Sequence, residues 1–219
     1  MTPEAVADQI RAEIAALSRA YTPELRELRK RWSVALKPEI SVAVLKAAQA
    51  LERDSPQERK WIAYELIRHH PGAFAAIGET EIEDFAGRIA SWYATDAFGT
   101  ILSGPLWAKG RLSNALLDAW SRSESRWLRR SALVATVGRN ATRPDAARTF
   151  ELCLRLAGDR DDMVEKAVSW ALRFLSQRDR PAVEAFFAEQ GGRFRPRVQR
   201  EVRHKLATGV KTPRGSAAS

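Results

Sequence analysis

Residues 92 to 96 place an aromatic ring and a carboxylate four positions apart. In the run Trp92-Tyr93-Ala94-Thr95-Asp96, a helix would bring Trp92 and Asp96 onto one face, because side chains four residues apart are neighbours there. A carboxylate stabilises a developing positive charge, and an electron-rich ring binds a cation. Judged on these residues alone, an Asp that caps a neighbouring helix or pairs with an arginine is the simpler interpretation.

The charge of the chain favours a polyanionic partner. The sequence has 36 Lys and Arg residues against 27 Asp and Glu residues, which gives a formal net charge of +9 and a pI near 10.2. Residues 193–214 carry +7 of this charge, with eight basic residues and one acid, Glu201. The alternative is that most arginines, which outnumber lysines 28 to 8, only cover solvated helix faces.

Seven tryptophans stand in this basic sequence, and most are expected to lie in the core. Trp61 and Trp127 continue apolar helix faces and are interpreted as packing residues. The single cysteine, Cys153, stands among leucines, so we expect a small buried apolar residue there.

Most common enzyme classes have no signature in this sequence. It contains no GxxxxGK[ST] phosphate loop, no GxGxxG after a strand, no HExxH and no GxSxG. The three histidines, His69, His70 and His204, form no plausible ligand set, and one cysteine cannot build a disulfide or a cysteine zinc site within the chain. We therefore expect neither a metal nor a cofactor.

Helical periodicity runs from end to end. Apolar residues recur three and four apart, as in Val42, Leu45, Ala48 and Leu51, and no stretch alternates as a strand does. Proline and glycine divide the chain into about ten to twelve helices. The sequence therefore predicts an all-α fold.

An internal repeat is visible in the same pattern. A basic residue followed by an apolar helical face recurs at positions 60, 130 and 166, and the skipped unit falls near position 95. These separations correspond to a period of about 35 residues, which is typical of a superhelical solenoid of HEAT-like helical repeats. We expect a single repeat domain over residues 1–207 and a disordered C-terminal tail over residues 208–219.

The sequence also gives expectations about location and assembly. No apolar run approaches the roughly 18 to 20 residues that span a bilayer, and residues 1–4 lack the basic-then-apolar order of a signal peptide. We expect no membrane partner and a soluble, cytoplasmic, nucleoid-associated monomer.

Three segments in order resemble a known family. Trp-x-x-x-Asp at Trp92 and Asp96 is followed by Trp-Leu-x-Arg, which ends at Arg130, and by Lys-Ala-x-x-Trp-x-Leu-Arg, which contains Trp170. This arrangement is similar to the AlkD family of bacterial DNA alkylation repair glycosylases, which are built from HEAT-like repeats. The resemblance covers roughly residues 15 to 206. Tyr93 departs from the pattern, because an acidic residue often follows the first Trp, and this leaves the preferred lesion open.

The resemblance implies a DNA glycosylase that excises cationic N3- or N7-alkylated purines from duplex DNA in base excision repair. It implies Asp96 as the catalytic carboxylate, Trp92 and Trp170 as its aromatic partners, and no cofactor. Together with the basic C-terminal segment, it also implies a set of DNA contacts, which are Arg130, Arg129, Lys166, Arg173, Tyr21, Arg195, Arg197 and Arg203.

Two other functions are compatible with the sequence. One is a non-catalytic member that binds branched or distorted DNA, a role that suits relatives without the Trp, Asp and Arg set. The other is a HEAT-type protein-interaction scaffold, which predicts an apolar or acidic groove. In a glycosylase, Trp92, Asp96, Arg130 and Trp170 are instead expected to meet in one accessible groove.

Overall fold

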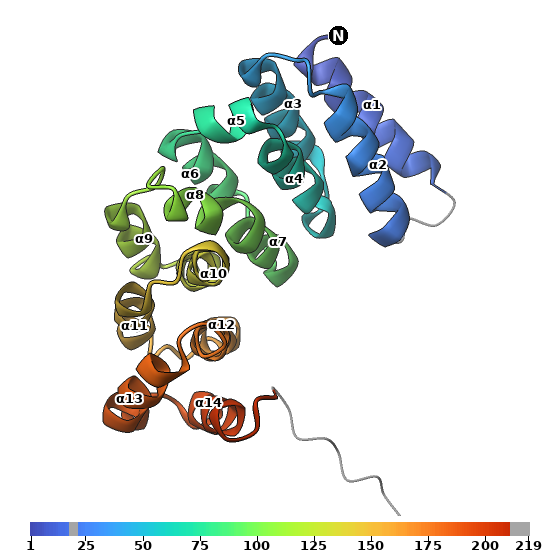
Figure 1. Ribbon diagram of the computed structural model, residues 1–219. Coiled ribbons are helices and arrows are strands. Elements are labelled where there is room, and N and C mark those ends of the chain that lie inside the picture. Colours follow the sequence, from blue (N-terminus) through green and yellow to red (C-terminus); the bar gives the residue numbers. More distant parts are fainter. Residues whose placement is uncertain (18–21, 211–219) are drawn as a thin grey trace, which may run out of the picture. The chain divides into compact units, whose positions relative to one another are not determined.

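The computed structural model describes residues 1–17 and 22–210, which form helices joined by short loops (Figure 1). No strand occurs in these ranges, so the predicted all-α class is confirmed. The chain divides into two compact units, Met1–Leu112 and Ser113–Ser219, called unit 1 and unit 2. None of the helices in the described ranges has the length and the apolar character that crossing a membrane requires.

Unit 1 begins with long helices and continues with shorter ones. The three long helices are α1 (Pro3–Ala16), α2 (Thr22–Ala35) and α3 (Ser41–Asp54). They are followed by a 3-10 turn and four short helices, η1 (Gln57–Arg59), α4 (Trp61–His69), α5 (Pro71–Ala76), α6 (Glu79–Gly87) and α7 (Trp92–Ala97). The unit ends with a π-helical segment, η2 (Phe98–Ser103), and α8 (Gly104–Ala108).

Helix starts in unit 1 follow from local chemistry. The Thr2 side chain accepts the N–H of Ala5 at the start of α1, where Pro3 occupies the first helical position. Ser91 caps α7 in the same way through the N–H of Ala94. Because α5, α7 and α8 have only five or six residues each, the chain has more and shorter helices than the periodicity predicts.

A buried carboxylate holds three segments of unit 1 together. Glu52 of α3 is fully buried and accepts hydrogen bonds from Lys60 Nζ at 2.7 Å and from Arg88 Nε at 2.6 Å. Lys60 is buried as well, whereas Arg88 also pairs with Asp84 at the surface. Burial, and then the charge of Glu52, raise the pKa of Tyr64 well above its usual value, so this phenol stays neutral.

Unit 2 consists of helices of 8 to 17 residues arranged in two layers. One layer contains α10 (Arg126–Thr142), α12 (Asp162–Leu175) and α14 (Pro196–Thr208), which pack side by side (Figure 1). The other contains α9 (Asn114–Ser121), α11 (Ala146–Arg155) and α13 (Arg180–Gln190), with the 3-10 turn η3 (Gly191–Arg193) before α14. Cys153 of α11 is fully buried, which confirms its prediction as a core residue.

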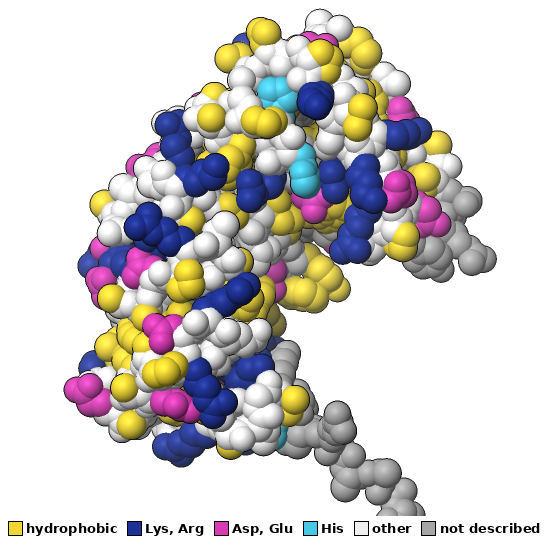
Figure 2. All heavy atoms as spheres, in the orientation of Figure 1, with side chains coloured by type: hydrophobic (Ala, Val, Ile, Leu, Met, Phe, Trp, Pro, Cys, Tyr) yellow, Lys and Arg dark blue, Asp and Glu magenta, His cyan; other side chains and the backbone are white. Residues whose placement is uncertain are grey.

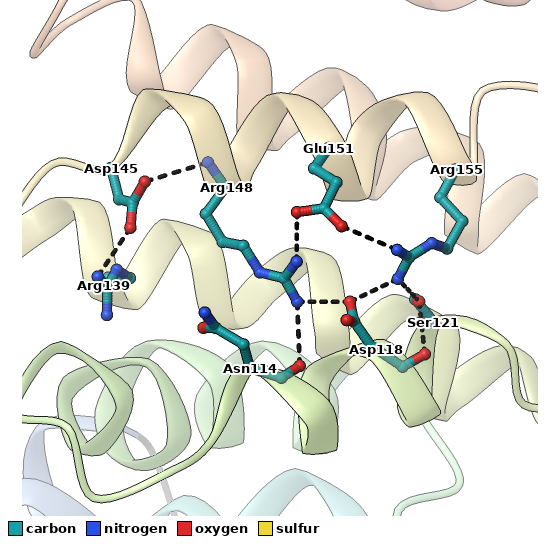
Figure 3. A network of polar contacts seen from close by, with 8 residues as sticks. All are labelled: Asn114, Asp118, Ser121, Arg139, Asp145, Arg148, Glu151 and Arg155. Carbon is teal, nitrogen blue, oxygen red and sulfur yellow. Dashed lines mark hydrogen bonds and ion pairs between the residues drawn. The ribbon is translucent and has the colours of Figure 1, made fainter.

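An ion-pair network joins α9 to α11 in unit 2 (Figure 3). Asp118 of α9 pairs with both Arg148 and Arg155 of α11, the latter at 2.5 Å. Glu151 pairs with the same two arginines. Arg148 also donates to the backbone carbonyl of Asn114 at 3.0 Å. Hydrogen bonds from these arginines lower the pKa of Asp118 even though its burial opposes the shift.

The helices repeat with nearly the predicted period. The helices α4, α7, α10, α12 and α14 start at residues 61, 92, 126, 162 and 196, so successive starts are 31, 34, 36 and 34 residues apart. Stacked helix pairs of this length are compatible with HEAT-like repeats. The superhelical arrangement and the predicted domain and tail boundaries stay predictions. Gly209, with φ of 75°, ends α14 in the left-handed conformation that favours glycine.

The tryptophans are less buried than predicted. Trp32, Trp107 and Trp120 are buried, Trp61, Trp127 and Trp170 are half-buried, and Trp92 is exposed. The interpretation of Trp61 and Trp127 as packing residues therefore holds for only part of each ring. At Trp127 the guanidinium of Arg126 lies 4.7 Å from the ring centroid.

The Glu52 cluster predicts a large stability effect. Replacing Glu52 by Gln should lower the free energy of unfolding by about 3 to 5 kcal/mol, because it leaves the buried Lys60 ammonium without its counter-charge. Urea unfolding followed by circular dichroism measures this loss. As a control, Asp84→Asn removes only the exposed partner of Arg88 and should cost less than about 1 kcal/mol. Equal, small losses for both variants would contradict the structural role of Glu52.

Candidate functional site

The helix α7 presents the predicted aromatic and carboxylate residues. Trp92 is 43% exposed and Asp96 is half-buried, one helical turn further along. The Ser91 cap fixes the start of this helix, and the π-helical segment η2 begins two residues after Asp96. The backbone carbonyl of Asp96 accepts a hydrogen bond from the Thr100 hydroxyl at 2.6 Å. A π-helical turn is frequently found at functional sites.

Tyr93 forms a contact that the sequence does not predict. Its ring stacks on that of Trp92, with the centroids 3.6 Å apart and the planes inclined by 26°. Tyr93 is itself 53% exposed, so both rings of the pair reach solvent. Consecutive residues of a helix do not normally face each other. The only signal in the sequence was the presence of two aromatic residues in succession.

Arg130, expected to hold a DNA phosphate, lies largely inside unit 2. It is 5% exposed and donates from Nη1 to the backbone carbonyl of Met163 in α12. This contact joins α10 to α12. Contact between Arg130 and DNA stays a prediction.

Arg129 also makes intramolecular contacts. Its Nε atom lies 2.6 Å from the Asp159 carboxylate, and its Nη1 atom donates to the backbone carbonyls of Ser123 and Glu124. The guanidinium therefore ties the start of α10 to the loop before α12. A DNA phosphate would compete with Asp159 for this cation.

The α12 residues of the predicted site differ in exposure. Trp170 is half-buried, and Lys166 is exposed but pairs with Asp162 at 2.6 Å. Arg173 is 7% exposed. Its Nε atom donates a hydrogen bond to the Ser169 hydroxyl at 3.0 Å, and its guanidinium lies 3.6 Å from the Glu201 carboxylate. Burial lowers the pKa of Arg173, and the charge of Glu201 opposes this shift.

The C-terminal arginines fall into two groups. Arg195 lies 3.4 Å from Glu165, and Arg197 pairs with Asp162, so these cations join α14 to α12. Arg203 is exposed, and so is Arg200, a residue that was not among the predicted contacts. Within the described ranges neither of them forms an ion pair. Tyr21 lies outside the described residues.

Asp162 of α12 forms ion pairs with two cations, Lys166 and Arg197. Hydrogen bonds from Lys166 and Arg197 lower its pKa, so the carboxylate stays ionised at neutral pH. The same contact raises the pKa of Arg197. Figure 2 shows basic side chains interspersed with acidic ones on the visible surface of unit 2. The positive charge of this unit is therefore partly neutralised by its own acids.

The predicted catalytic and phosphate-binding residues are divided between the two units. Trp92 and Asp96 lie in unit 1, and Arg130 and Trp170 lie in unit 2. Their meeting in one groove stays a prediction. In the described part of the chain, no group of three or more His, Cys, Asp and Glu side chains could hold a metal ion.

Comparison with known proteins gives the family of the chain. A search of curated proteins found no match. The model of the family described as "DNA alkylation repair enzyme" matches residues 20–206, which include α7, the ion-paired α12 and nearly all of α14. The match thus contains every residue of the predicted site, and the chain belongs to the DNA alkylation repair enzyme family.

Proposed function

We propose that this protein is a DNA glycosylase that hydrolyses the N-glycosidic bond of cationic N3- or N7-alkylated purines in duplex DNA. The observation that carries the proposal is the accessible Trp92 beside the half-buried Asp96 on α7, in a chain of the alkylation repair family. A role in the repair of alkylated DNA follows from the family itself. The glycosylase reaction and its substrate are the proposed steps.

The chemistry requires only one carboxylate. A purine alkylated at N3 or N7 is positively charged, so the base leaves without being protonated by the enzyme. Most glycosidases use a second carboxyl group as an acid. Here Asp96 stabilises the oxocarbenium-like charge that develops on the deoxyribose, and it orients the attacking water.

Aromatic faces suit the cationic nucleotide. An electron-rich ring binds a cation with about 0.5 to 2 kcal/mol, depending on how far the pair is shielded from water. Trp92 offers such a face on α7, and Trp170 offers one on α12. Stacking on Tyr93 restricts the rotation of Trp92, so its ring loses less freedom when a nucleotide binds.

DNA affinity in this proposal comes mainly from exposed cations. Arg200 and Arg203 contact phosphates directly, whereas Arg195 and Arg197 first exchange an acid of α12 for a phosphate. We propose that Arg130 and Arg129 position the phosphate that flanks the lesion. Contacts to phosphates carry no sequence information, which suits an enzyme that acts on damage in any sequence.

Binding of branched or distorted DNA without catalysis is a second candidate. The burial of Arg130 and its contact with Met163 favour it, because a cation held inside the fold contributes less to the positioning of a phosphate. The two functions differ in one measurement, since only a glycosylase releases 7-methylguanine or 3-methyladenine from methylated duplex DNA.

The first test of the glycosylase concerns its carboxylate. Asp96→Asn keeps the shape of the side chain and removes its charge, so base release should fall by about 100-fold or more while duplex affinity is retained. Single-turnover release of 7-methylguanine and fluorescence anisotropy measure the two quantities. Glu83→Gln, which removes an exposed charge of α6, is the matched control and should excise normally. Excision by the Asp96→Asn protein at the wild-type rate would identify Asp96 as a structural residue.

A second test uses the charge of the lesion. The proposed site supplies no separate acid, so cationic alkylpurines should be released and neutral bases should not. Duplexes that contain 7-methylguanine, hypoxanthine or uracil at one position are compared under the same conditions. Efficient release of uracil would contradict the single-carboxylate mechanism.

A third test separates exposed cations from paired ones on α14. Each phosphate contact contributes a slope of roughly −0.9 to the dependence of log affinity on log salt. The double variant Arg200→Gln/Arg203→Gln should therefore reduce the slope by about 1 to 2. Arg195→Gln/Arg197→Gln removes the same charge, but its main effect should be a lower melting temperature, because Glu165 loses its partner and Asp162 keeps only Lys166. Equal slopes for the two variants would refute this assignment.

A further inference from the structure

A cleft of about 480 Å³ opens in unit 1 beside the Trp92 and Tyr93 pair. Its walls come from α2, from η1 and α4, and from α7 with η2. The lining side chains that bear on its chemistry are Arg26, Glu58, Arg59, Trp61, Glu65 and Tyr93. Small-molecule sites commonly have volumes of about 300 to 1,000 Å³, so this space is large enough for one nucleotide.

Residues spaced four apart along their helices form two walls of the cleft. Tyr93, Ala97 and Ile101 stand four residues apart and line one side. Trp61 and Glu65 stand four apart on α4 and line another. The cleft therefore has two aromatic side chains, of which Tyr93 is 53% exposed and Trp61 half-buried. An exposed aromatic face is a surface on which a base can stack.

Two arginine side chains from different elements line the cleft. Arg26 comes from α2 and Arg59 from η1. Within the described ranges neither guanidinium forms an ion pair or a hydrogen bond. The carboxylate of Glu65, by contrast, is neutralised by Arg29 at 2.5 Å. The available positive charge of the cleft is thus opposed by one exposed carboxylate, that of Glu58.

We propose that this cleft binds one nucleotide of a DNA strand, with its phosphate on Arg26 and Arg59 and its base against Tyr93 and Trp61. An arginine pair recognises a phosphate through charge-assisted hydrogen bonds, and Glu58 accepts hydrogen bonds from an exocyclic amino group. The inference rests on the proposed function only for the identity of the partner as DNA. Because Tyr93 stacks on Trp92, the bound nucleotide lies next to the Trp92 and Asp96 face of α7.

Binding of a five-nucleotide single strand to the full chain tests the inference. Arg26→Gln/Arg59→Gln should weaken binding by about ten-fold or more. Lys46→Gln/Arg53→Gln removes the same charge from exposed positions of α3 outside the cleft and should weaken binding by about two-fold or less. Fluorescence anisotropy gives the affinities, and thermal unfolding checks that all variants are folded. Equal losses in the two double variants would overturn the proposal.

A second pair of variants tests whether the Tyr93 ring contributes to binding. Tyr93→Leu should weaken binding of the same strand by about five-fold without changing the salt slope, because stacking releases no counterions. Tyr93→Phe keeps the ring and should restore the affinity. A Tyr93→Leu protein that binds as tightly as the wild type would contradict the role of the ring.

Two further measurements are needed. One distinguishes a free nucleotide from a DNA strand as the ligand, and the other distinguishes this inference from the glycosylase proposal. Titration with deoxyadenosine monophosphate tests a free nucleotide, and affinity equal to that of the strand would overturn the assignment to DNA. Release of 7-methylguanine is measured on the same proteins. If no base is released but the cleft variants lose strand binding, the glycosylase proposal fails and this inference stands. If base release is normal and the cleft variants bind as the control does, the inference alone fails.

Discussion

Short amphipathic helices cannot bury their apolar faces alone, and every other feature of this chain depends on how they share a core with their neighbours. In unit 2 the stacked helices α10, α12 and α14 also share polar groups. Arg130 donates across to the Met163 carbonyl, and Arg195 reaches Glu165. A buried cation is stable only when the next helix satisfies it. The same contacts that stack the repeats therefore determine which arginines remain accessible.

This constraint changes the meaning of the high net charge. A charge of +9 describes the whole sequence, yet Arg129, Arg173 and Arg197 each have an acid of unit 2 beside them. Such pairs contribute little to long-range attraction until a phosphate replaces the carboxylate. Arg200 and Arg203 of α14 are exposed and form no ion pair in the described part of the chain, whereas the intervening Glu201 lies beside Arg173 of α12. The positions of the acidic residues, more than the number of arginines, therefore determine which cations can contact a polyanion.

The sequence predicted those features that depend on local spacing. The all-α class, the period of the helices and the shared face of Trp92 and Asp96 all follow from separations within one or two helical turns or from a regular repeat. The Glu52 cluster was not predicted, because its partners lie 8 and 36 residues away and meet only through packing. The stack of Tyr93 on Trp92 was missed because adjacent helical residues normally diverge. Burial of Arg130 depends likewise on the neighbouring helix.

In the proposed glycosylase reaction, the position of α7 accounts for how one carboxylate suffices to excise a base that already carries a positive charge. Asp96 is half-buried, so its field acts through a medium of lower dielectric than water, whereas Trp92 and Tyr93 stay exposed to meet a nucleotide. The Ser91 cap and the π-helical segment hold the two ends of this short helix. A preorganised charge stabilises a transition state because little reorganisation is needed during the reaction. Tyr93 stacks on Trp92 and also lines the neighbouring cleft, so in the two proposals together α7 positions both the reacting nucleotide and a flanking one.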